Sequence, residues 1–438
     1  MKRQFLSIFT IAIRGLSENI AWEIGHDMNS LESAKTANTF SVSGVINNVT
    51  SLLKKEAGLV YTAIGNMGAA LLGGLFWFIL AGLLPVDSYG LLNYYISIAN
   101  IFYAIGLLGM DATVTTFLAK GEKTVHYQAI SLTLISGIAI AAILSVYNWS
   151  SGMLAITLMF FTMTIAETLG KKMYRQYALL FISQRVVQIV LAIILYYQLG
   201  ILGVLIGYII GNLIFSYRYF RNALPNFTLN FNEIKQKRKF AMHSYGTGII
   251  RTFSNFLDKL IIAPLFGYYL LGLYQLGFQF FLFLSIIPLS LYAYLLPEES
   301  SGKDKKTIKL IGVALSIVAA IAAIIGLPYI IERFFSNFTE SIPIVQIMSL
   351  AIIPATIIAI LSATLLGRGN SKPVFIAGIA YIIALVIGLV TLGQTIGPIG
   401  LAITLLIAQT VQASYLCLKR KPKQPLNNPI DQTNQTTQ

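Results

Sequence analysis

Long apolar runs separated by short polar connections occupy the chain from about residue 58 to about residue 418. A helix needs roughly 20 apolar residues to cross the hydrocarbon core of a bilayer, which is about 30 Å thick. Strands are not expected there, because an open sheet would leave backbone groups unpaired in lipid. The pattern predicts an all-α integral membrane protein with about twelve spans, at residues 58–83, 89–110, 125–147, 151–168, 174–198, 200–219, 240–266, 269–295, 307–330, 343–366, 373–393 and 396–418.

The composition and charge agree with this prediction. Hydrophobic residues make up 56% of the chain and charged residues only 11%, whereas soluble domains average roughly a quarter charged. All but four of the 31 Lys and Arg residues lie on one side of the predicted spans; the exceptions are Arg333, on the opposite side, and Arg185, Arg251 and Lys259, within spans. Because basic residues favour cytoplasmic loops, we expect a protein of the cytoplasmic membrane with both termini cytoplasmic. Its net charge of +14 then indicates contact with membrane lipids and no nucleic-acid partner.

Residues that would carry enzyme chemistry are scarce. The chain has a single cysteine, Cys417, and three histidines, and no Cys/His cluster has the spacing of a metal site. No Gly-rich phosphate loop or nucleophile elbow stands out. We therefore predict no metal, no cofactor and no catalytic residue, and we do not expect an enzyme.

An internal repeat organises the chain. Residues 88–97 (SYGLLNYYIS) align with residues 270–279 (LLGLYQLGFQ), which pairs Gly90 with Gly272. An even number of helices in each half makes the repeats parallel, so a pseudo-twofold axis along the membrane normal is expected, with the site between the halves. The predicted organisation is a cytoplasmic extension at 1–57, a six-helix bundle at 58–219, a basic linker at 220–239, a second six-helix bundle at 240–418 and a disordered cytoplasmic tail at 419–438.

The extension has one apolar run, FLSIFTIAI at 5–13, which follows Lys2 and Arg3 like a short signal peptide. No small-residue cleavage site follows, and cleavage would leave Lys54 and Lys55 on the side that otherwise lacks basic residues. We therefore predict an amphipathic segment at the membrane interface, with Met28 as an alternative start of the chain.

Ionisable residues inside the spans are the most informative feature for function. Ser244, Gly248, Arg251, Asn255 and Asp258 recur at helical spacing and share one face of the seventh span. Arg251 lies about 16 Å from the end of that span that carries the basic connections, at 1.5 Å per residue, which is close to mid-depth. A central arginine costs about 2.5–3.5 kcal/mol on insertion scales and usually faces a watery cavity or a partner.

Other spans carry similar polar groups. Arg185, in the fifth span, lies at a depth comparable to that of Arg251 and clusters with Gln184 and Gln188. Two alternatives to a binding role stay open: Arg251 pairs with Asp258 or Glu167 to lock helices together, or the amides only form hydrogen bonds between helices. A structural pair of Asp258 and Lys259 near the opposite boundary is a third. The remaining polar faces comprise Asn93, Ser97, Asn100 and Asp111 on the second span, and Gln275 and Gln279 on the eighth.

Several segments resemble the polysaccharide-biosynthesis membrane proteins. They are LPVDSYGLLNYYISIANIFYAIGLLGMDATVTTFLAKG (84–121), DKLIIAPLFGYYLLGLYQLG (258–277), IPLSLYAYLLPEES (287–300) and LLGRGNSKPVF (365–375). The resemblance covers roughly residues 55–420 and does not extend to the N-terminal extension. It implies two six-helix bundles around a central cavity, and a flippase for lipid-linked oligosaccharides that alternates between two openings. That family is similar to lipid II flippases and multidrug antiporters in one superfamily.

The chemistry of such a cargo suits the polar residues of the spans. A sugar chain on a polyprenyl phosphate or diphosphate has an anionic headgroup, and arginine offers phosphate a fixed charge and a planar fork of donors. A coupling proton or sodium ion is left open as a further partner. On this hypothesis the substrate-binding residues are Arg185, Arg251, Gln188, Asn255, Asn93, Asn100, Gln275 and Gln279, and those for ion coupling or gating are Asp258, Lys259, Asp111 and Glu167.

Two other functions stay open. A multidrug or cation antiporter of the same superfamily would need a carboxylate deep in the first or seventh helix, but the first span has no charge and the seventh presents Arg251 at mid-depth. A membrane glycosyltransferase or polymerase would need substantial loops to position its acceptor. The longest connection on the non-basic side, about 331–342, is short, and its Glu332 and Glu340 do not form a convincing acid/base pair.

Overall fold

The structure is a computed structural model that describes residues 57–223 and 225–419; the extension and tail predicted at 1–57 and 419–438 lie, but for their inner ends, outside the described residues. The described chain contains helices and no strand. The first half comprises α3 (Ala57–Leu83), α4 (Val86–Leu107), α5 (Met110–Ala119), α6 (Lys123–Tyr147), α7 (Trp149–Gly170), α8 (Tyr174–Leu199), α9 (Ile201–Phe215) and α10 (Tyr217–Ala223). The remainder comprises α11 (Asn232–Gln236), α12 (Arg238–Leu284), α13 (Ile286–Ser300), α14 (Lys306–Phe334), the 3₁₀ helix η2 (Ser336–Ser341), α15 (Ile342–Leu350), α16 (Ile352–Gly367), α17 (Lys372–Ile396) and α18 (Pro398–Lys419).

These helices account for the twelve predicted spans. Within the described residues, ten helical segments are long and apolar enough to cross a membrane, and the bent pair α9–α10 provides an eleventh. The longest of the ten, Arg238–Ser300, has non-helical backbone at Gly267 (φ 85°, ψ 169°) and so contains two crossings. Gly267 permits this break because a positive φ carries no steric cost without a Cβ atom. The protein is therefore a multi-pass membrane protein of about twelve spans.

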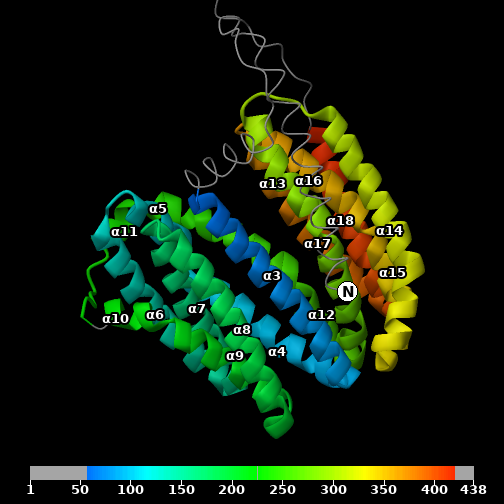
Figure 1. The fold of residues 1–438 in the computed structure, drawn as a ribbon, viewed down its shortest axis with the longest axis horizontal. Helices are drawn as coiled ribbons and strands as arrows, with labels where there is room; N and C mark the ends of the chain where they lie inside the picture. The colour runs from blue at the N-terminus through cyan, green and yellow to red at the C-terminus, as the bar shows by residue number, and fades with distance from the viewer. Residues whose placement is uncertain (1–56, 224, 420–438) are drawn as a thin grey trace, which may run out of the picture. The chain divides into compact units, whose positions relative to one another are not determined.

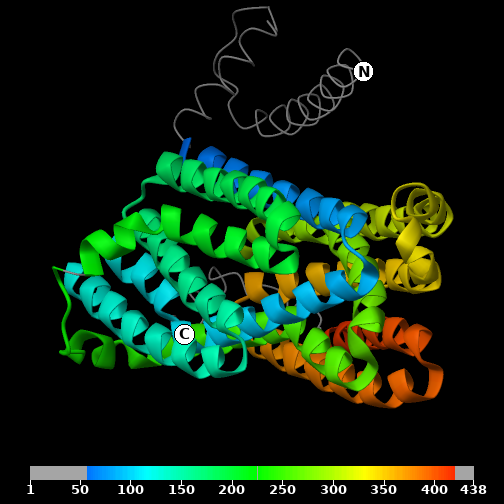
Figure 2. The ribbon, with the colours of Figure 1, turned by 90° about the horizontal axis from the view of Figure 1, so that it is seen from below.

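The crossings form two groups that correspond to the predicted halves. In Figure 1, α5 to α10 gather on one side and α13 to α18 on the other, with α3, α4 and α12 between them. In Figure 2, at right angles to the first view, the teal helices of the first half lie to the left and the yellow, orange and red helices of the second half lie to the right. Successive crossings alternate in direction, so the connections rich in Lys and Arg all lie at one end of the helices. We call this the basic end.

Two glycines that the repeat aligns meet where α4 crosses α12. A Cβ atom on Gly90 would lie 1.9 Å from the Tyr268 carbonyl oxygen, and one on Gly272 would lie 2.2 Å from the Val86 carbonyl oxygen. The repeat aligns Val86 with Tyr268 just as it aligns Gly90 with Gly272. Gly90 therefore contacts Tyr268, and Gly272 contacts Val86, the residue that the repeat aligns with Tyr268. A twofold axis produces such reciprocal contacts. The predicted axis passes through this crossing.

A second pair of glycines repeats near the end of each half. Gly200 (φ 60°, ψ −139°) precedes α9 and Gly397 (φ 70°, ψ −139°) precedes α18, so the two turns have the same backbone conformation. Three residues later, a Cβ atom on Gly203 would lie 2.0 Å from the Leu195 carbonyl oxygen, and one on Gly400 would lie 2.0 Å from that of Leu392. The repeat thus extends to the last helices of both halves.

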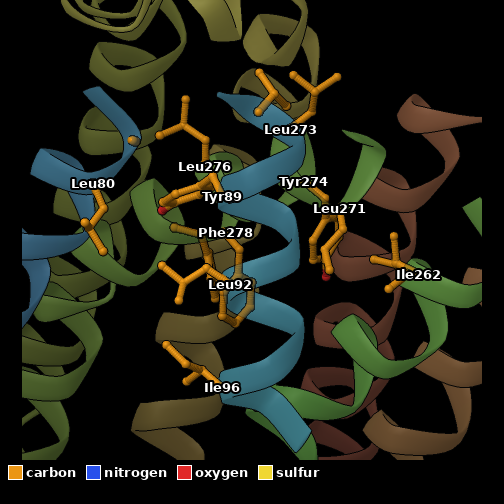
Figure 3. Packing of buried hydrophobic residues seen from close by; sticks show 14 of the residues in the cluster. Leu80, Tyr89, Leu92, Ile96, Ile262, Leu271, Leu273, Tyr274, Leu276 and Phe278 are labelled. Carbon is orange, nitrogen blue, oxygen red and sulfur yellow. The ribbon is translucent and has the colours of Figure 1, made fainter. Parts of the chain in front are cut away.

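A continuous hydrophobic core joins the halves around this crossing. Figure 3 shows Tyr89, Leu92 and Ile96 along α4, close to residues of α12 such as Leu273 and Leu276. These five side chains are all nearly or fully buried. Since burial of each large apolar side chain contributes about 1.5–3 kcal/mol, the crossing is a fixed point about which the halves pack.

We expect Gly90→Ala to destabilise the protein far more than Gly326→Ala. The added methyl at position 90 would overlap the backbone of α12, whereas nothing lies within 4 Å of a Cβ on Gly326 in α14. Overpacking usually costs about 1–3 kcal/mol, and more against immovable backbone. The measurement is the thermal unfolding midpoint in detergent; equal midpoints for the two variants would contradict the close crossing.

The connection between the halves is docked on α6 of the first half. The Thr228 N–H donates to Ser131 Oγ (3.0 Å), and the Ile234 N–H donates to Gln128 Oε1 (3.2 Å). Lys237 pairs with Glu122 at 3.2 Å. Movement between the halves would therefore have to begin after this segment, at the start of α12.

Candidate functional site

A small pocket lies between the two halves, bounded by the end of α4 and the start of α5 on one side and by α12 on the other. Its volume is about 50 Å³, which is room for a few water molecules or a small polar group, since one water needs roughly 10–15 Å³. The side chains that matter for its chemistry are those of Tyr103, Asp111, Ser244, Arg251 and Thr252.

Arg251 reaches this pocket from α12 without an ion-pair partner. Among the described residues no carboxylate oxygen lies within 4.0 Å of its guanidinium, and its own backbone carbonyl accepts a hydrogen bond from Asn255 Nδ2 (2.9 Å). Its side chain is exposed. The alternative that Arg251 pairs with Asp258 or Glu167 is therefore wrong, because both carboxylates are held by other groups.

Asp258 and Lys259 form a buried ion pair within the second half. Their side chains are 1% and 2% exposed, and Lys259 Nζ lies 2.9 Å and 3.0 Å from the two carboxylate oxygens. Tyr274 OH donates to Asp258 Oδ2 (2.8 Å), and Lys259 Nζ lies 3.7 Å from the centre of the Phe278 ring. Tyr274 and Phe278 follow the break at Gly267, so the pair ties together the two limbs of α12.

Glu167, at the basic end of α7, is also fully engaged. Lys171 Nζ lies 2.5 Å from its Oε1, and Asn222 Nδ2 donates to its Oε2 at 2.9 Å. His126 Nε2 is 3.7 Å from the same Oε2. This cluster joins α6, α7 and α10, which indicates that Glu167 fixes the basic end of the first half.

Arg185 lies in a polar cluster of the first half and does not share the pocket of Arg251. Its Nη1 donates to Gln188 Oε1 (2.7 Å), while Gln184 Nε2 donates to Asn212 Oδ1 (2.8 Å). Its guanidinium packs against Gly73 of α3, where a Cβ atom would lie 3.6 Å from Nε. That Nε is buried without a hydrogen-bond partner. Arg185 thus packs against α3 with one hydrogen bond to a neutral amide and no carboxylate partner among the described residues.

The amides of α4 and α12 have mixed roles. Asn93 and Asn100 each donate to a carbonyl of α4 itself, those of Tyr89 and Ile96, both at 2.8 Å. Gln275 is 4% exposed and its Oε1 is buried without a hydrogen-bond partner. Gln279 is 5% exposed, and its Nε2 lies 3.9 Å from a Cβ atom on Gly74. The two asparagine side chains therefore form hydrogen bonds within α4, whereas the side-chain oxygen of Gln275 accepts none.

Asp111 does not continue the polar face of α4, contrary to the prediction. Leu108 (φ 53°) and Gly109 (φ 73°) are both left-handed, so α4 ends there and Asp111 begins a new helix, α5. The break redirects the chain and places Asp111 on the pocket with Arg251. A Leu-Gly dipeptide inside an apolar run was the only sign of this break in the sequence.

Sequence reasoning missed two hydroxyl groups on the pocket. Tyr103 OH accepts a hydrogen bond from Thr162 Oγ1 (3.1 Å), which leaves its own hydrogen available to the pocket. Thr252 lies next to Arg251 in sequence and did not fit the helical spacing of the polar face. It also missed Asn212, a lone amide in the apolar α9, which binds Gln184. Among the described residues no group of His, Cys, Asp and Glu could hold a metal ion.

Twelve crossings in two repeated halves, with polar groups between and within the halves, define a multi-pass helical membrane protein built from an internal repeat. A family model described as a polysaccharide biosynthesis protein matches residues 153–307. No curated protein matches the chain as a relative.

Three solved structures share the fold. A lipid II flippase, MurJ, in an inward closed conformation, is 15% identical with a TM-score of 0.63, covering 83% of this chain and 88% of that one. An inward-facing multidrug-resistance MATE transporter of the MOP superfamily is 16% identical with a TM-score of 0.62, covering 83% and 98%. An outward-facing MATE transporter is 14% identical with a TM-score of 0.56, covering 83% and 95%. The resemblance drawn from the sequence and the fold of two six-helix bundles are therefore confirmed.

Proposed function

We propose that the protein flips a polyprenyl-phosphate- or polyprenyl-diphosphate-linked oligosaccharide across the cytoplasmic membrane by alternating access, for the assembly of a cell-surface glycan. The observation that carries this proposal is Arg251. Its guanidinium lies near mid-depth on a pocket between the halves, and no carboxylate of the described residues pairs with it. A permanently charged group in that position requires a polar or anionic partner, and the headgroup of such a lipid supplies one.

The other groups on the pocket suit the same headgroup. Tyr103, Ser244 and Thr252 carry hydroxyls beside Arg251, and hydroxyls can donate to phosphate oxygens or bind sugar hydroxyls. Arginine donates in a planar fork that matches phosphate. The polyprenyl tail can stay in the surrounding lipid, because only the polar part of the cargo needs a path between the halves.

Arg185 is proposed as a second anion contact in the first half. It retains a buried Nε without a partner, and Gln188 accepts a hydrogen bond from only one edge of its guanidinium. Gln275, with its free Oε1, is the amide best placed to bind a sugar hydroxyl. A headgroup that passes between the halves could meet these groups only after the halves move apart, since Arg185 does not line the pocket of Arg251.

The ion that would couple transport is restricted by the same contacts. The oxygens of Asp258 are occupied by Lys259 and Tyr274, and those of Glu167 by Lys171 and Asn222. Of the three carboxylates considered for this role, Asp111 is the one that faces the pocket without an ion pair among the described residues. A cation antiporter would have to use this carboxylate opposite an arginine, which is unfavourable for a cationic cargo.

The direct test is transport by the purified full chain in lipid vesicles. Fluorescent polyprenyl-diphosphate oligosaccharide is expected to become accessible to an impermeant reductant faster than in protein-free vesicles, whereas a cationic dye is not expected to be moved. Movement of the dye without movement of the lipid would favour the antiporter and contradict the flippase.

We predict that the basic end is cytoplasmic. Asp87 and Asn337 lie at the opposite end, Gln236 lies at the basic end, and all three side chains are exposed. In a Cys417→Ser background, cysteines at Asp87 and Asn337 should react with an impermeant thiol reagent in intact cells, and one at Gln236 should not. Labelling at Gln236 alone would reverse the orientation.

A further inference from the structure

Two opposite charges from different halves share the pocket between the halves. Asp111 reaches it from α5 and Arg251 from α12. Neither belongs to an ion pair within the described residues, whereas the neighbouring charges Asp258, Lys259 and Glu167 all do. Opposite charges on two walls of one small pocket attract each other, and the attraction is weakened by salt to the extent that the exposed side chain of Arg251 meets solvent.

The halves touch directly beside these charges. Gly109, at the break between α4 and α5, lines the same pocket, and a Cβ atom on it would lie 2.6 Å from the Ala241 carbonyl oxygen and 2.8 Å from the Tyr245 nitrogen. Ala241 and Tyr245 belong to the first turns of α12. This backbone contact joins α12 to the first half beside the pocket. We call this contact, with Asp111 and Arg251, the basic-end seam.

The charge pair has no counterpart in the other copy of the repeat. At the offset that aligns Gly90 with Gly272, Asp111 aligns with Ala293 and Arg251 aligns with Ala69. The symmetry-related position therefore carries two alanines. A charge pair present in only one copy of the repeat is not required by the fold that both copies share. It can therefore have a function specific to the basic end.

We propose that Asp111 is the internal counter-ion of Arg251 and holds the basic-end seam closed while the pocket is empty. An anionic headgroup would compete with Asp111 for the guanidinium, and its binding would release the attraction between the halves. Because a ligand shifts a conformational equilibrium only through its different affinities for the two states, this competition gives the anion a direct means of opening the seam. The second part rests on the proposed function; the latch itself does not.

The closed seam has a consequence for transport. On this proposal, Asp111 attracts the guanidinium of Arg251 across the seam while the pocket is empty. A headgroup that enters from the basic end meets a guanidinium that is already oriented toward the pocket, and it replaces the carboxylate charge with its own. Substrate binding and opening would thus be the same event, which limits opening without cargo.

The test measures the separation of the halves and does not require transport. Spin labels on cysteines at Lys120 and Lys239, both exposed and at the basic end of different halves, report the seam in the full chain in lipid nanodiscs with Cys417→Ser. Asp111→Asn is expected to shift this distance distribution to longer values. Asp111→Glu should leave it as in the parent. A second label pair, at the exposed Asp87 and Arg333 of the opposite end, should not lengthen.

Three further variants separate charge from packing. Gly109→Ala should lengthen the basic-end distance through steric overlap even with both charges present. The exchanged pair Asp111→Arg with Arg251→Asp should restore the short distance that either single change loses. Lys237→Gln removes the partly exposed ion pair with Glu122 and should have little effect, since such pairs contribute little. An unchanged distribution in Asp111→Asn, or an exchanged pair that stays open, would overturn the latch.

Added ligand distinguishes the latch from the proposed function. Polyprenyl phosphate should lengthen the basic-end distance in the parent protein, but it should not lengthen it further in Asp111→Asn. If inorganic phosphate at the same concentration has the same effect, the latch is supported and the phosphate headgroup alone causes the opening. If Asp111→Asn opens the seam while neither anion does, the latch stands and the anionic-lipid function fails. If the lipid is flipped but Asp111→Asn changes no distance, the function stands and the latch fails.

Discussion

Arg251→Ala is expected to slow flipping of the lipid-linked oligosaccharide by roughly one to two orders of magnitude while leaving the protein folded. The side chain is exposed on the pocket and forms no ion pair within the described residues, and Asp111, its proposed counter-ion, is only partly buried, so its removal leaves no fully buried charge behind. Loss of a charge-assisted hydrogen bond costs about 1.5–3 kcal/mol, which corresponds to a roughly ten- to hundred-fold lower rate at limiting substrate. Arg251→Lys should retain part of the activity, because lysine keeps the charge but loses the planar fork.

The controls for this prediction follow from the contacts. Arg333→Ala removes an exposed arginine at the opposite end and should flip at the parental rate in vesicles of matched protein content. The double variant Arg251→Ala with Asp258→Ala should be no better than Arg251→Ala, since Asp258 pairs with Lys259. Rescue in the double variant would show that Arg251 serves only to neutralise Asp258, against the geometry described.

Lys259→Met is expected to be among the most destabilising single substitutions in the chain. It would leave the Asp258 carboxylate 1% exposed and without its cation. Removing one partner of a buried ion pair typically costs about 3–5 kcal/mol, because the remaining charge is uncompensated. The thermal unfolding midpoint in detergent and the yield of monodisperse protein should both fall sharply.

The double variant Lys259→Met with Asp258→Asn tests the reason for that loss. It removes both charges and keeps similar volumes, so most of the stability should return. Lys237, which pairs with Glu122 at 3.2 Å and is 26% exposed, offers a lysine whose ion pair lies nearer the solvent: Lys237→Met should cost less. A Lys259→Met protein as stable as the parent would mean that Asp258 is neutral or reaches water.

The twelve crossings and their repeat could be read from the sequence because both depend on local chemistry. A run of roughly 20 apolar residues has few alternatives in a bilayer, and most predicted spans agree with the helices to within a few residues. Pairing Gly90 with Gly272 from a weak alignment identified two residues that touch at the axis. Only glycine allows two helices to cross at that distance, so the close approach leaves a trace in the sequence.

The partners of the charged residues could not be read in the same way. Helical spacing put Arg251 and Asp258 on one face, yet Asp258 pairs with the adjacent Lys259 and with Tyr274 from beyond the Gly267 break. Lys259 has a long, flexible side chain, and its orientation depends on which nearby residues offer a carboxylate and an aromatic ring. Asp111 was placed on the wrong helix because two left-handed residues interrupt α4.

The sequence by itself determined that this protein spans the membrane about twelve times, that its halves are repeats and that the basic connections share one end, because hydrophobic length, helical period and loop charge act within one segment at a time. Only the tertiary structure decided which polar groups meet: Asp258 pairs with Lys259 inside the second half, Arg185 bonds to Gln188 in the first, and Asp111 and Arg251 line one pocket between the halves. The reason is physical. The cost of a charge in a membrane protein is set by the residues that surround it in space, and those come from helices far apart in the chain.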